Sequence, residues 1–396
     1  MKTINVIGLG YVGLPAALQF CNYGYQVFGT DTNKELITNL KKGVLETTEA
    51  GMQKELHKAL NNQIYFSQNY YKADMYVIAV PTHFDRTTKK IDPCYLISAV
   101  NSIIEVCEED AVIVVESTVS PGTIKLYLEP LLKGKQLKIA HAPERILPGS
   151  TLYELRNNDR VIGADEVAVR EQVKTVYQSF CSGKIRTTDI ATAEMSKVIE
   201  NTFRDVNIAF ANELKKICDR MGIDVYEVIS LANCHSRVDI LKPGAGVGGH
   251  CISVDPWFLV GDFPELTQLI SKARLVNDSM PRYVWEKLLK QITTKKIGIY
   301  GLTYKANVDD TRESPAWQLY RGMSKDEKQR TVFYDPYVQE KIYEEQVTEF
   351  ADFLNKVEII LVMAPHDHLN QQIEIVKERG IHIYDPYNTI SSGIKI

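Results

Sequence analysis

A glycine-rich turn between a predicted strand and a predicted helix is the feature that most constrains how this chain folds. Residues 4–7, Ile-Asn-Val-Ile, have a strand pattern, residues 8–13 read Gly-Leu-Gly-Tyr-Val-Gly, and an apolar helical pattern begins at Leu14. In such a pattern Gly8 permits a tight turn, Gly10 lets the backbone approach a pyrophosphate, and Gly13 lets the helix pack closely. The turn therefore predicts a dinucleotide site with contacts from Gly8, Gly10, Tyr11, Val12 and Gly13.

An acidic residue follows the second predicted strand. Residues 25–30 lead to Asp31, at about the position where a carboxylate binds the 2′-hydroxyl of the adenosine ribose. A glycine turn without a ligand is the alternative. Because the strand, the glycines, the helix and the acid all agree, we predict cofactor binding, and Asp31 favours NAD over NADP.

Three further apolar runs, at 75–80, 111–115 and 137–140, are typical of strands that end in small or polar residues. Ligands of parallel α/β sheets lie outside the carboxyl ends of the strands. We therefore expect the residues after these runs to line the site, with Glu144 available for acid or base chemistry. A surface ion pair of Glu144 with Arg145 is the alternative. The residues expected at these strand ends are Pro81, Thr82, Thr118 and Glu144.

Residues 191–221 have a helical pattern and predict a long connecting helix. Polar positions recur at spacings of three and four, so Lys197 and Asn201 share one helical face. A solvated face without function is the alternative for this polar stripe, although the apolar positions around it weaken that interpretation. The polar stripe consists of Glu194, Lys197, Asn201 and Arg204, and the broad apolar surface of Met195, Val198, Ile199, Phe203, Val206 and Phe210.

A glycine-rich stretch precedes a cysteine that is suited to covalent chemistry. Residues 242–249 read Lys-Pro-Gly-Ala-Gly-Val-Gly-Gly, which is too flexible for a helix and can wrap backbone amides around a phosphate or sugar. Cys251 follows, with Asp255 four residues later, and a thiolate at the start of a helical turn is stabilised by the helix dipole. The alternative is that Cys251 is a small buried hydrophobe and that Asp255 caps a helix starting at Pro256.

A second α/β pattern occupies the last part of the chain. A strand predicted at 295–300 runs into Gly301, and the tetrapeptide Tyr-Asp-Pro-Tyr occurs after two later strands, at 334–337 and 384–387. The G-x-G-x-x-G pattern is incomplete here. We therefore expect a ligand other than a dinucleotide in this region.

Two cations and two histidines of this region could contact a ligand. Lys305 and Arg312 are available for phosphates, and a salt-bridged loop is the alternative. The histidines of His366-Asp367-His368 are separated by one residue and have no partner ligands in the sequence, so we assign no metal site to them.

Charge and cysteine usage limit the partners of the chain. Its net charge is −4 and its basic residues are dispersed, so we expect neither nucleic acid nor an anionic membrane surface as a partner. No apolar run reaches transmembrane length, and the amino terminus lacks a secretion-signal pattern. The seven cysteines include no Cys-x-x-Cys pair, which disfavours a disulfide framework or structural zinc and suits a reducing cytoplasm.

Together these motifs resemble the UDP-glucose/GDP-mannose dehydrogenase family over essentially the whole chain. The resemblance implies an NAD-dependent enzyme that oxidises the C6 alcohol of a nucleotide sugar to a carboxylate through an aldehyde and a cysteine thioester, with two NADH formed. The motifs that carry it are residues 8–13, 116–118, 142–144, 248–255 and 310–314, with Lys197, Asn201 and Lys305.

Two departures from the family pattern indicate the substrate. Most UDP-glucose and GDP-mannose enzymes have Ser before the cysteine and Lys before the motif aspartate, where this chain has His250 and Val254. With residues 237–241 and Trp257-Phe258, this stretch resembles the N-acetylhexosamine branch. The resemblance implies UDP-N-acetyl-D-mannosamine as the substrate, with UDP-N-acetylglucosamine as the close alternative and UDP-glucose as a more remote one.

The resemblance also implies the domains and the site residues. It implies an α/β fold of two doubly wound Rossmann-like domains joined by a central helical region: an NAD-binding domain (1–188), a central dimerisation domain with the cysteine (189–290) and a nucleotide-sugar-binding domain (291–396). It implies a homodimer or larger homo-oligomer in which Arg237 reaches the sugar pocket of a neighbouring subunit. Implied catalytic residues are Thr118, Glu144, Lys197, Asn201, Cys251 and Asp255. Implied substrate contacts are Glu144, Arg145, Lys197, Asn201, Arg237, Gly248 and Lys305, and implied further cofactor contacts are Pro81, Thr82, Thr118 and Arg312.

Two other functions are compatible with parts of the sequence. A β-hydroxyacid dehydrogenase would share the NAD unit and a helix with Lys followed by Asn, but it needs neither an active cysteine nor a third domain. A non-catalytic nucleotide-sugar-binding protein would keep the fold without the reaction. The presence of Lys197, Asn201, Cys251 and Asp255 together argues against it.

Overall fold

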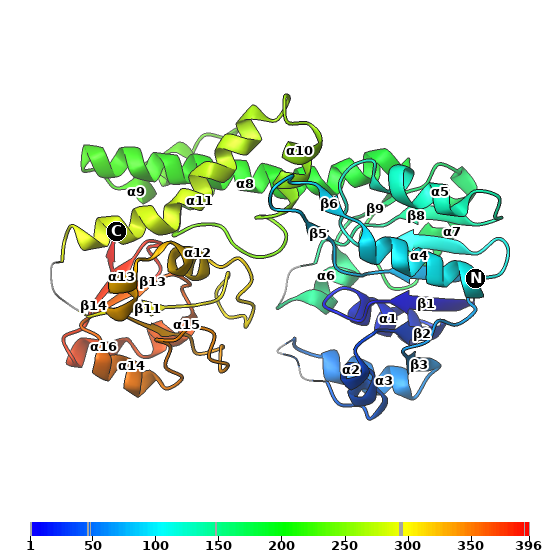
Figure 1. Cartoon of the computed structure of the whole chain (residues 1–396), viewed down its shortest axis with the longest axis horizontal. Coiled ribbons are helices and arrows are strands. Elements are labelled where there is room, and N and C mark those ends of the chain that lie inside the picture. The colour runs from blue at the N-terminus through cyan, green and yellow to red at the C-terminus, as the bar shows by residue number, and fades with distance from the viewer. Residues whose placement is uncertain are drawn as a thin grey trace. The chain divides into compact units, whose positions relative to one another are not determined.

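The computed structural model describes residues 2–45, 47, 49–146, 149–292, 296–391 and 393–395. Contacts divide the chain into two compact units, Met1–Glu200 and Asn201–Ile396, which we call the first and second unit and treat separately (Figure 1). Lys295, where the second α/β pattern was predicted to begin, lies outside the described residues. The bounds of the three predicted domains stay a prediction.

The first unit is built on an eight-stranded sheet in the order β10-β9-β8-β7-β4-β1-β2-β3. The six neighbouring strands β8-β7-β4-β1-β2-β3 are all parallel to one another. Their order is that of a dinucleotide-binding Rossmann sheet. The pair β9 and β10 runs antiparallel to β8. The strands are β1 (Thr3–Ile7), β2 (Gln26–Thr30), β3 (Ile64–Ser67), β4 (Met75–Ile78), β7 (Val112–Val115), β8 (Lys138–His141), β9 (Arg160–Gly163) and β10 (Ile185–Thr188), and a small hairpin is formed by β5 (His83–Phe84) and β6 (Ile91–Asp92).

Helices cover this sheet, and every residue of the central strands β4 and β7 is buried. On one face of β1, Ile4 and Val6 are fully buried, and they belong to a core that also contains α1, α3 and α7 side chains such as Leu18, Leu56 and Val173. The helices are α1 (Gly13–Asn22), α2 (Lys34–Lys41), α3 (Met52–Leu60), α4 (Cys94–Val106), a π-helical turn η1 (Ile124–Leu128), α5 (Glu129–Leu132), α6 (Thr151–Asn157) and α7 (Val167–Gln178).

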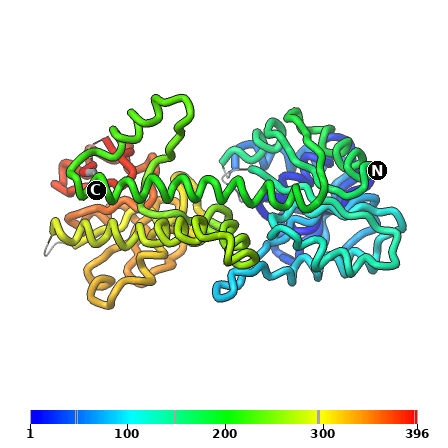
Figure 2. Tube along the Cα trace, turned by 90° about the horizontal axis from the view of Figure 1, so that it is seen from above, coloured from blue at the N-terminus to red at the C-terminus, as the bar shows by residue number. Residues whose placement is uncertain are grey.

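The helix α8 (Ile190–Met221) begins in the first unit and ends in the second, and Figure 2 shows it as one uninterrupted tube. The predicted helix at 191–221 is therefore confirmed. For several residues on its two faces, burial is the reverse of what the polarity of the side chain suggests. Glu194, Lys197 and Asn201 are buried, whereas Phe203, Phe210 and Ile199 are exposed. The solvated-face alternative is wrong for these three polar residues, and it applies to Arg204.

The second unit contains a five-stranded parallel sheet in the order β12-β11-β13-β14-β15, the flavodoxin-like order of a doubly wound fold. The fold class predicted from the sequence, with two doubly wound parts and a long helix, is confirmed. The strands are β11 (Ile297–Tyr300), β12 (Thr331–Tyr334), β13 (Ile359–Val362), β14 (His382–Asp385) and β15 (Ile394–Lys395). The helices are α9 (Val225–Ala232), α10 (Asp255–Asp262), α11 (Gln268–Leu289), α12 (Pro315–Gly322), α13 (Lys325–Gln329), α14 (Phe350–Lys356), α15 (Asp367–Gln371) and α16 (Ile373–Glu378).

Among the described helices, none combines the length and the apolar character that crossing a membrane requires.

Candidate active site

The glycine turn of the first unit has the geometry of a dinucleotide site. Gly8 has a φ of +86°, and a Cβ there would lie 2.6 Å from the Ala79 carbonyl oxygen, so only glycine fits. A Cβ on Gly13 would lie 1.8 Å from the Gly8 oxygen, which shows how closely α1 approaches the turn. Around Gly10, by contrast, no described atom lies within 4 Å of a Cβ position. The turn is therefore tight on one side and open at Gly10, where a pyrophosphate would approach.

Asp31 lies at the end of β2 and faces this turn. Its Oδ2 accepts the Leu9 N–H at 2.8 Å, and its Oδ1 accepts the Asn33 N–H at 2.8 Å. Each carboxylate oxygen has a second lone pair for a ligand hydroxyl, and the side chain is only partly buried. The arrangement fits the ribose of NAD.

The loops after β4 and β7 are joined by hydrogen bonds. The Thr82 hydroxyl donates to the Thr118 carbonyl at 2.8 Å, and the Ser117 hydroxyl donates to the Val80 carbonyl at 2.6 Å. Pro81 is exposed beside them. These contacts bring together the residues that the sequence assigned to the carboxyl ends of these strands.

Glu144 is buried and paired with a residue that the sequence reasoning missed. Its Oε2 forms an ion pair with Arg160 Nη2, and its Oε1 accepts the Arg145 N–H at 2.6 Å. Arg160, at the start of β9, is also 3.6 Å from Glu116 Oε1, which accepts the Tyr177 hydroxyl at 2.6 Å. The predicted alternative of a surface pair between Glu144 and the Arg145 side chain is therefore wrong.

Glu116, Glu144, Arg160 and Tyr177 form one buried cluster, in which the charge of each group affects the others. Burial raises the pKa of the Glu116 carboxyl to about 7, although the Arg160 guanidinium opposes that shift. The guanidinium also lies 4.7 Å from the centre of the Tyr177 ring. The Arg145 side chain instead pairs with Glu200 and donates to the Asp159 carbonyl at 3.1 Å.

The buried face of α8 contacts η1 and the end of β8. Glu194 accepts the N–H groups of Gly122 and Ile124 at 2.6 and 2.9 Å, so it has a structural role. At the end of β8, His141 Nδ1 donates to the Val115 carbonyl at 2.9 Å, which leaves Nε2 as an acceptor without a hydrogen-bond partner among the described residues. Burial, together with the charge of Lys197, lowers the pKa of His141 to about 4, although the hydrogen bond to Val115 opposes this shift.

In the second unit, Asn201 of α8 contacts the start of α10. Its Nδ2 donates to Asp255 Oδ2 at 2.6 Å, and both residues are buried. Asp255 is the first residue of α10, not its cap, so the predicted alternative of a cap before Pro256 is wrong by one position. The amide and carboxylate expected to act together are thus in direct contact.

Cys251 lies on the turn that leads into α10, and it is exposed, so the alternative of a buried hydrophobe is wrong. Its carbonyl accepts the N–H groups of Val254 and Asp255 at 3.1 and 2.8 Å, as in a helical turn. The two glycines before it have a packing role. A Cβ on Gly248 would lie 2.4 Å from the Glu313 carbonyl oxygen, and one on Gly249 (φ +85°) would lie 2.8 Å from the Tyr304 ring.

The loop after β11 supplies charged groups beside this turn. Arg312 forms a two-point ion pair with Asp310, with nitrogen–oxygen distances of 2.9 and 2.6 Å. Lys305 is exposed, and Arg237 on the loop after α9 is also exposed. A cavity of about 370 Å³ lies next to Arg312 and is lined by Thr311, Arg312, Glu313, Trp317, Ile342 and Tyr343.

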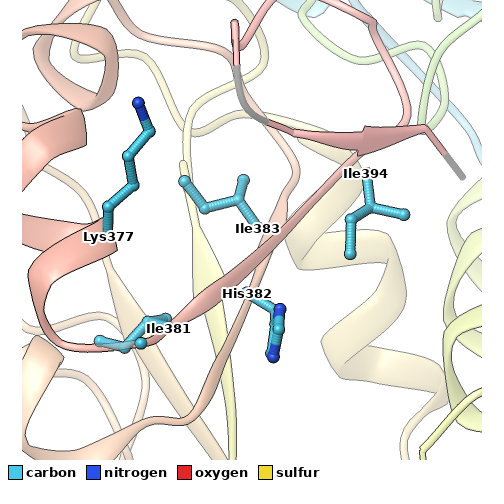
Figure 3. A pocket seen from close by; sticks show the side chains of 6 residues that line it. Lys377, Ile381, His382, Ile383 and Ile394 are labelled. Carbon is cyan, nitrogen blue, oxygen red and sulfur yellow. The ribbon is translucent and has the colours of Figure 1, made fainter.

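Another cavity of the second unit, of about 240 Å³, is shown in Figure 3. It lies at the amino end of β14, away from the carboxyl ends where ligands of parallel sheets bind. We therefore do not assign it to the site. Its lining residues are Lys377, Gly380, Ile381, His382, Ile383 and Ile394.

His366 belongs to a closed hydrogen-bond network. Its Nδ1 accepts the Asn307 N–H at 2.8 Å, so its Nε2 carries the proton and donates to Asp335 at 2.9 Å. The ring of His368 stacks on Tyr300. Among the described residues, no three His, Cys, Asp or Glu side chains are grouped as a metal site would require.

Domains of one known protein family match the chain in three successive segments, and the first match agrees with the Rossmann sheet of the first unit. Residues 2–181 match the NAD binding domain of the UDP-glucose/GDP-mannose dehydrogenase family, residues 191–279 its central domain, and residues 298–391 its UDP binding domain. With the Rossmann sheet and its glycine turn, these matches define an NAD-binding dehydrogenase. The chain belongs to the UDP-glucose/GDP-mannose dehydrogenase family.

Individual relatives resemble the chain over nearly its full length. It is 45% identical to a UDP-N-acetyl-D-mannosamine dehydrogenase of Methanocaldococcus jannaschii, over 92% of this chain and 86% of the relative. A solved UDP-N-acetyl-mannosamine dehydrogenase from S. aureus is 35% identical and covers 99% of this chain and 96% of its own, with a TM-score of 0.88. The corresponding enzyme structure from Pyrococcus horikoshii is 33% identical, with a TM-score of 0.89 and coverage of 100% and 97%.

Proposed function

We propose that this dehydrogenase oxidises the C6 hydroxyl of UDP-N-acetyl-D-mannosamine to the carboxylate of UDP-N-acetyl-D-mannosaminuronate. The observation that carries the proposal is the 45% identity to a UDP-N-acetyl-D-mannosamine dehydrogenase over 92% of the chain. The oxidation removes four electrons in two steps and consumes two NAD. His250 and Val254, which distinguish this chain from the UDP-glucose pattern, support the same substrate.

The residues of the first unit suit NAD. The open backbone at Gly10 admits a pyrophosphate, and the two oxygens of Asp31 suit the ribose hydroxyls, with Tyr11, Val12, Thr82 and Thr118 as further contacts. Pro81 and Arg312 complete the proposed set. When bound, NAD supplies the two-electron acceptor for each oxidation.

Lys197 and Asn201 are proposed to stabilise negative charge on the C6 oxygen. Lys197 is buried on α8, so its ammonium acts with little screening by water. The Asn201 amide is oriented by its bond to Asp255 Oδ2 at 2.6 Å, which leaves one amide hydrogen and the amide oxygen for the substrate or a bound water.

Cys251 is proposed as the nucleophile. Its thiolate adds to the C6 aldehyde and forms a carbon–sulfur bond, and oxidation of the resulting thiohemiacetal gives a thioester. Asp255 activates the water that hydrolyses this thioester, and Glu144 and Thr118 assist. Hydrolysis releases the acid and the free thiol and makes the overall reaction effectively irreversible.

Glu144, Arg145, Gly248 and Lys305 are proposed to bind the nucleotide sugar with the residues above, and a second subunit is proposed to contribute Arg237. The exposed apolar side chains of α8 and α11 support a homodimer. Sedimentation should show a dimer or larger assembly. A fully active monomer would exclude the contribution of Arg237 from a second chain.

One assay tests the reaction. The enzyme is incubated with NAD and, separately, UDP-N-acetylmannosamine, UDP-N-acetylglucosamine, UDP-glucose and GDP-mannose, and the NADH formed per sugar nucleotide is counted. We expect two NADH per UDP-N-acetylmannosamine and little turnover of the others. The variant Cys251→Ser should stop after the aldehyde and should not form the acid in full yield. Full acid with two NADH from this variant would show that the nucleophile is assigned wrongly.

A further inference from the structure

His250 directly precedes Cys251 and lies between the thiol and a carboxylate. Its Nδ1 is 3.6 Å from Asp310 Oδ2, and its imidazole also hydrogen-bonds the Cys251 side chain. Asp310 is held by Arg312, whose backbone N–H donates to Oδ1 at 3.0 Å and whose guanidinium contacts both oxygens. Within the second unit, the Cys251 thiol, the His250 imidazole and the Asp310 carboxylate thus follow one another in space, with the imidazole in the middle.

The charges around His250 favour its protonated form. Burial alone would lower the pKa of His250, but its contacts with Asp310 and Cys251 raise that pKa to about 9. The same contacts, with those of Arg312, hold the pKa of Asp310 well below its usual range in spite of burial. The charged and titratable groups that face His250 are Cys251, Asp310 and Arg312, and the last of these opposes the imidazolium.

We propose that His250 is a catalytic residue: its imidazole takes the proton of the Cys251 thiol, and the Asp310 carboxylate orients and balances the resulting imidazolium. In this step the sulfur–hydrogen bond breaks, its electron pair stays on Sγ, and the proton joins a ring nitrogen, so no further reactant is needed. The positive charge of the imidazolium then stabilises the thiolate until it adds to the aldehyde. Arrangements of nucleophile, base and orienting carboxylate are a general solution for activating a weak nucleophile.

This inference rests on the proposed function, in which Cys251 is the nucleophile, but it is tested without turnover. The ligand-free enzyme is treated with iodoacetamide from about pH 6 to about pH 10, and alkylation of the Cys251 peptide is followed by mass spectrometry. At neutral pH we expect Cys251 to react about tenfold more slowly in His250→Gln than in the wild type. The two rates should converge above about pH 9, where His250 loses its proton. Asp310→Asn should slow Cys251 in the same direction.

The chain contains a matched control. Cys234 and His235 are also adjacent and exposed, but Nδ1 of His235 accepts the Arg237 N–H at 3.3 Å. The variant His235→Gln should leave the alkylation of Cys234 unchanged. The buried thiol of Cys218 reports on folding, since it stays unmodified in a variant whose second unit is intact.

Equal alkylation of Cys251 in His250→Gln and wild type at every pH, with Cys218 still protected, would overturn the role of His250. That result would leave the proposed function standing if Cys251→Ser still failed to make acid. Full acid production by Cys251→Ser would instead overturn the proposed function, whatever the alkylation rates.

Discussion

The two sheets share one structural feature at the carboxyl ends of their first strands, β1 and β11, but the hydrogen bonds around it differ. After β1, Gly8 (φ +86°) turns the chain so that the next amide donates to Asp31, which follows β2. After β11, Gly301 (φ +89°) does the same, and the Leu302 N–H donates to Asp335, which follows β12. In each case a Cβ would collide with the alanine after the neighbouring strand, Ala79 or Ala364.

The difference lies in what else the polar groups contact. Asp335 is fully buried and also accepts from Thr303, His366 and Tyr337, so its oxygens are used within the protein. Asp31 is partly exposed and accepts two backbone amides, those of Leu9 and Asn33.

The buried histidines at these sheet ends differ in the same way. Both ring nitrogens of His366 are hydrogen-bonded, whereas Nε2 of His141 has no hydrogen-bond partner among the described residues. We infer that the carboxyl end of a Rossmann-like sheet binds a dinucleotide only where its acidic residue is left available. In the second unit, we predict that a ligand is held by side chains on loops, such as Lys305 and Arg312.

The largest expected effect separates the two acids. Asp335→Ala should lower the free energy of unfolding by about 3–5 kcal/mol, because several buried donors lose their acceptor. Asp31→Ala should cost less than about 1 kcal/mol and instead weaken NAD binding about tenfold. Urea unfolding followed by tryptophan fluorescence suits the first variant, since all three tryptophans lie in the second unit. Equal destabilisation by both variants would contradict the comparison.

A smaller effect concerns the acid sensitivity of the first sheet. His141 has a pKa of about 4 in the folded chain against an ordinary value of 6.5, so its protonation opposes folding. Its stabilising contribution is complete above pH 6.5 and falls as the pH drops toward 4, with a loss of about 2 kcal/mol between pH 7 and pH 5. Urea unfolding followed by circular dichroism at these two pH values should show a smaller loss in His141→Gln. An identical pH dependence in the variant would refute this assignment.

The smallest effect on energy is the most specific to NAD. Gly10→Ala should leave the unfolding free energy within about 0.5 kcal/mol, because the added methyl meets open space, but it should weaken NAD binding about tenfold, or 1.4 kcal/mol. Gly8→Ala is the matched contrast and should destabilise the fold. Calorimetric titration with NAD gives the measurement, and wild-type affinity in Gly10→Ala would mean that the pyrophosphate does not approach there.

Local patterns were sufficient for much of this architecture. The turn at residues 8–13, the acid at Asp31 and the limits of α8 could be predicted because each depends on neighbours within a few turns or one strand. The roles assigned to the site residues stay predictions until they are measured.

Long-range partners could not be predicted in this way. The ion pair of Glu144 with Arg160 depends on the antiparallel contact of β8 with β9, and nothing near Glu144 in the sequence indicates it. An arginine opening an apolar strand at 160–163 was the available signal. For α8, the pattern showed two different faces, but periodicity does not say which face is covered. Glu194 and Asn201 of its polar stripe are buried because Glu194 accepts the Ile124 N–H of η1 and Asn201 contacts Asp255.

The close packing of Gly248 and Gly249 has a consequence for how such enzymes diversify. Their α-hydrogens press against Glu313 and Tyr304, so the segment with the thiol and the loop after β11 have complementary surfaces with no room for a side chain between them. In a chimera that takes only one of these segments from a relative, the two contacting surfaces no longer fit each other. Recombination between branches should therefore succeed when residues 243–255 and 301–315 are exchanged together, as one inherited module.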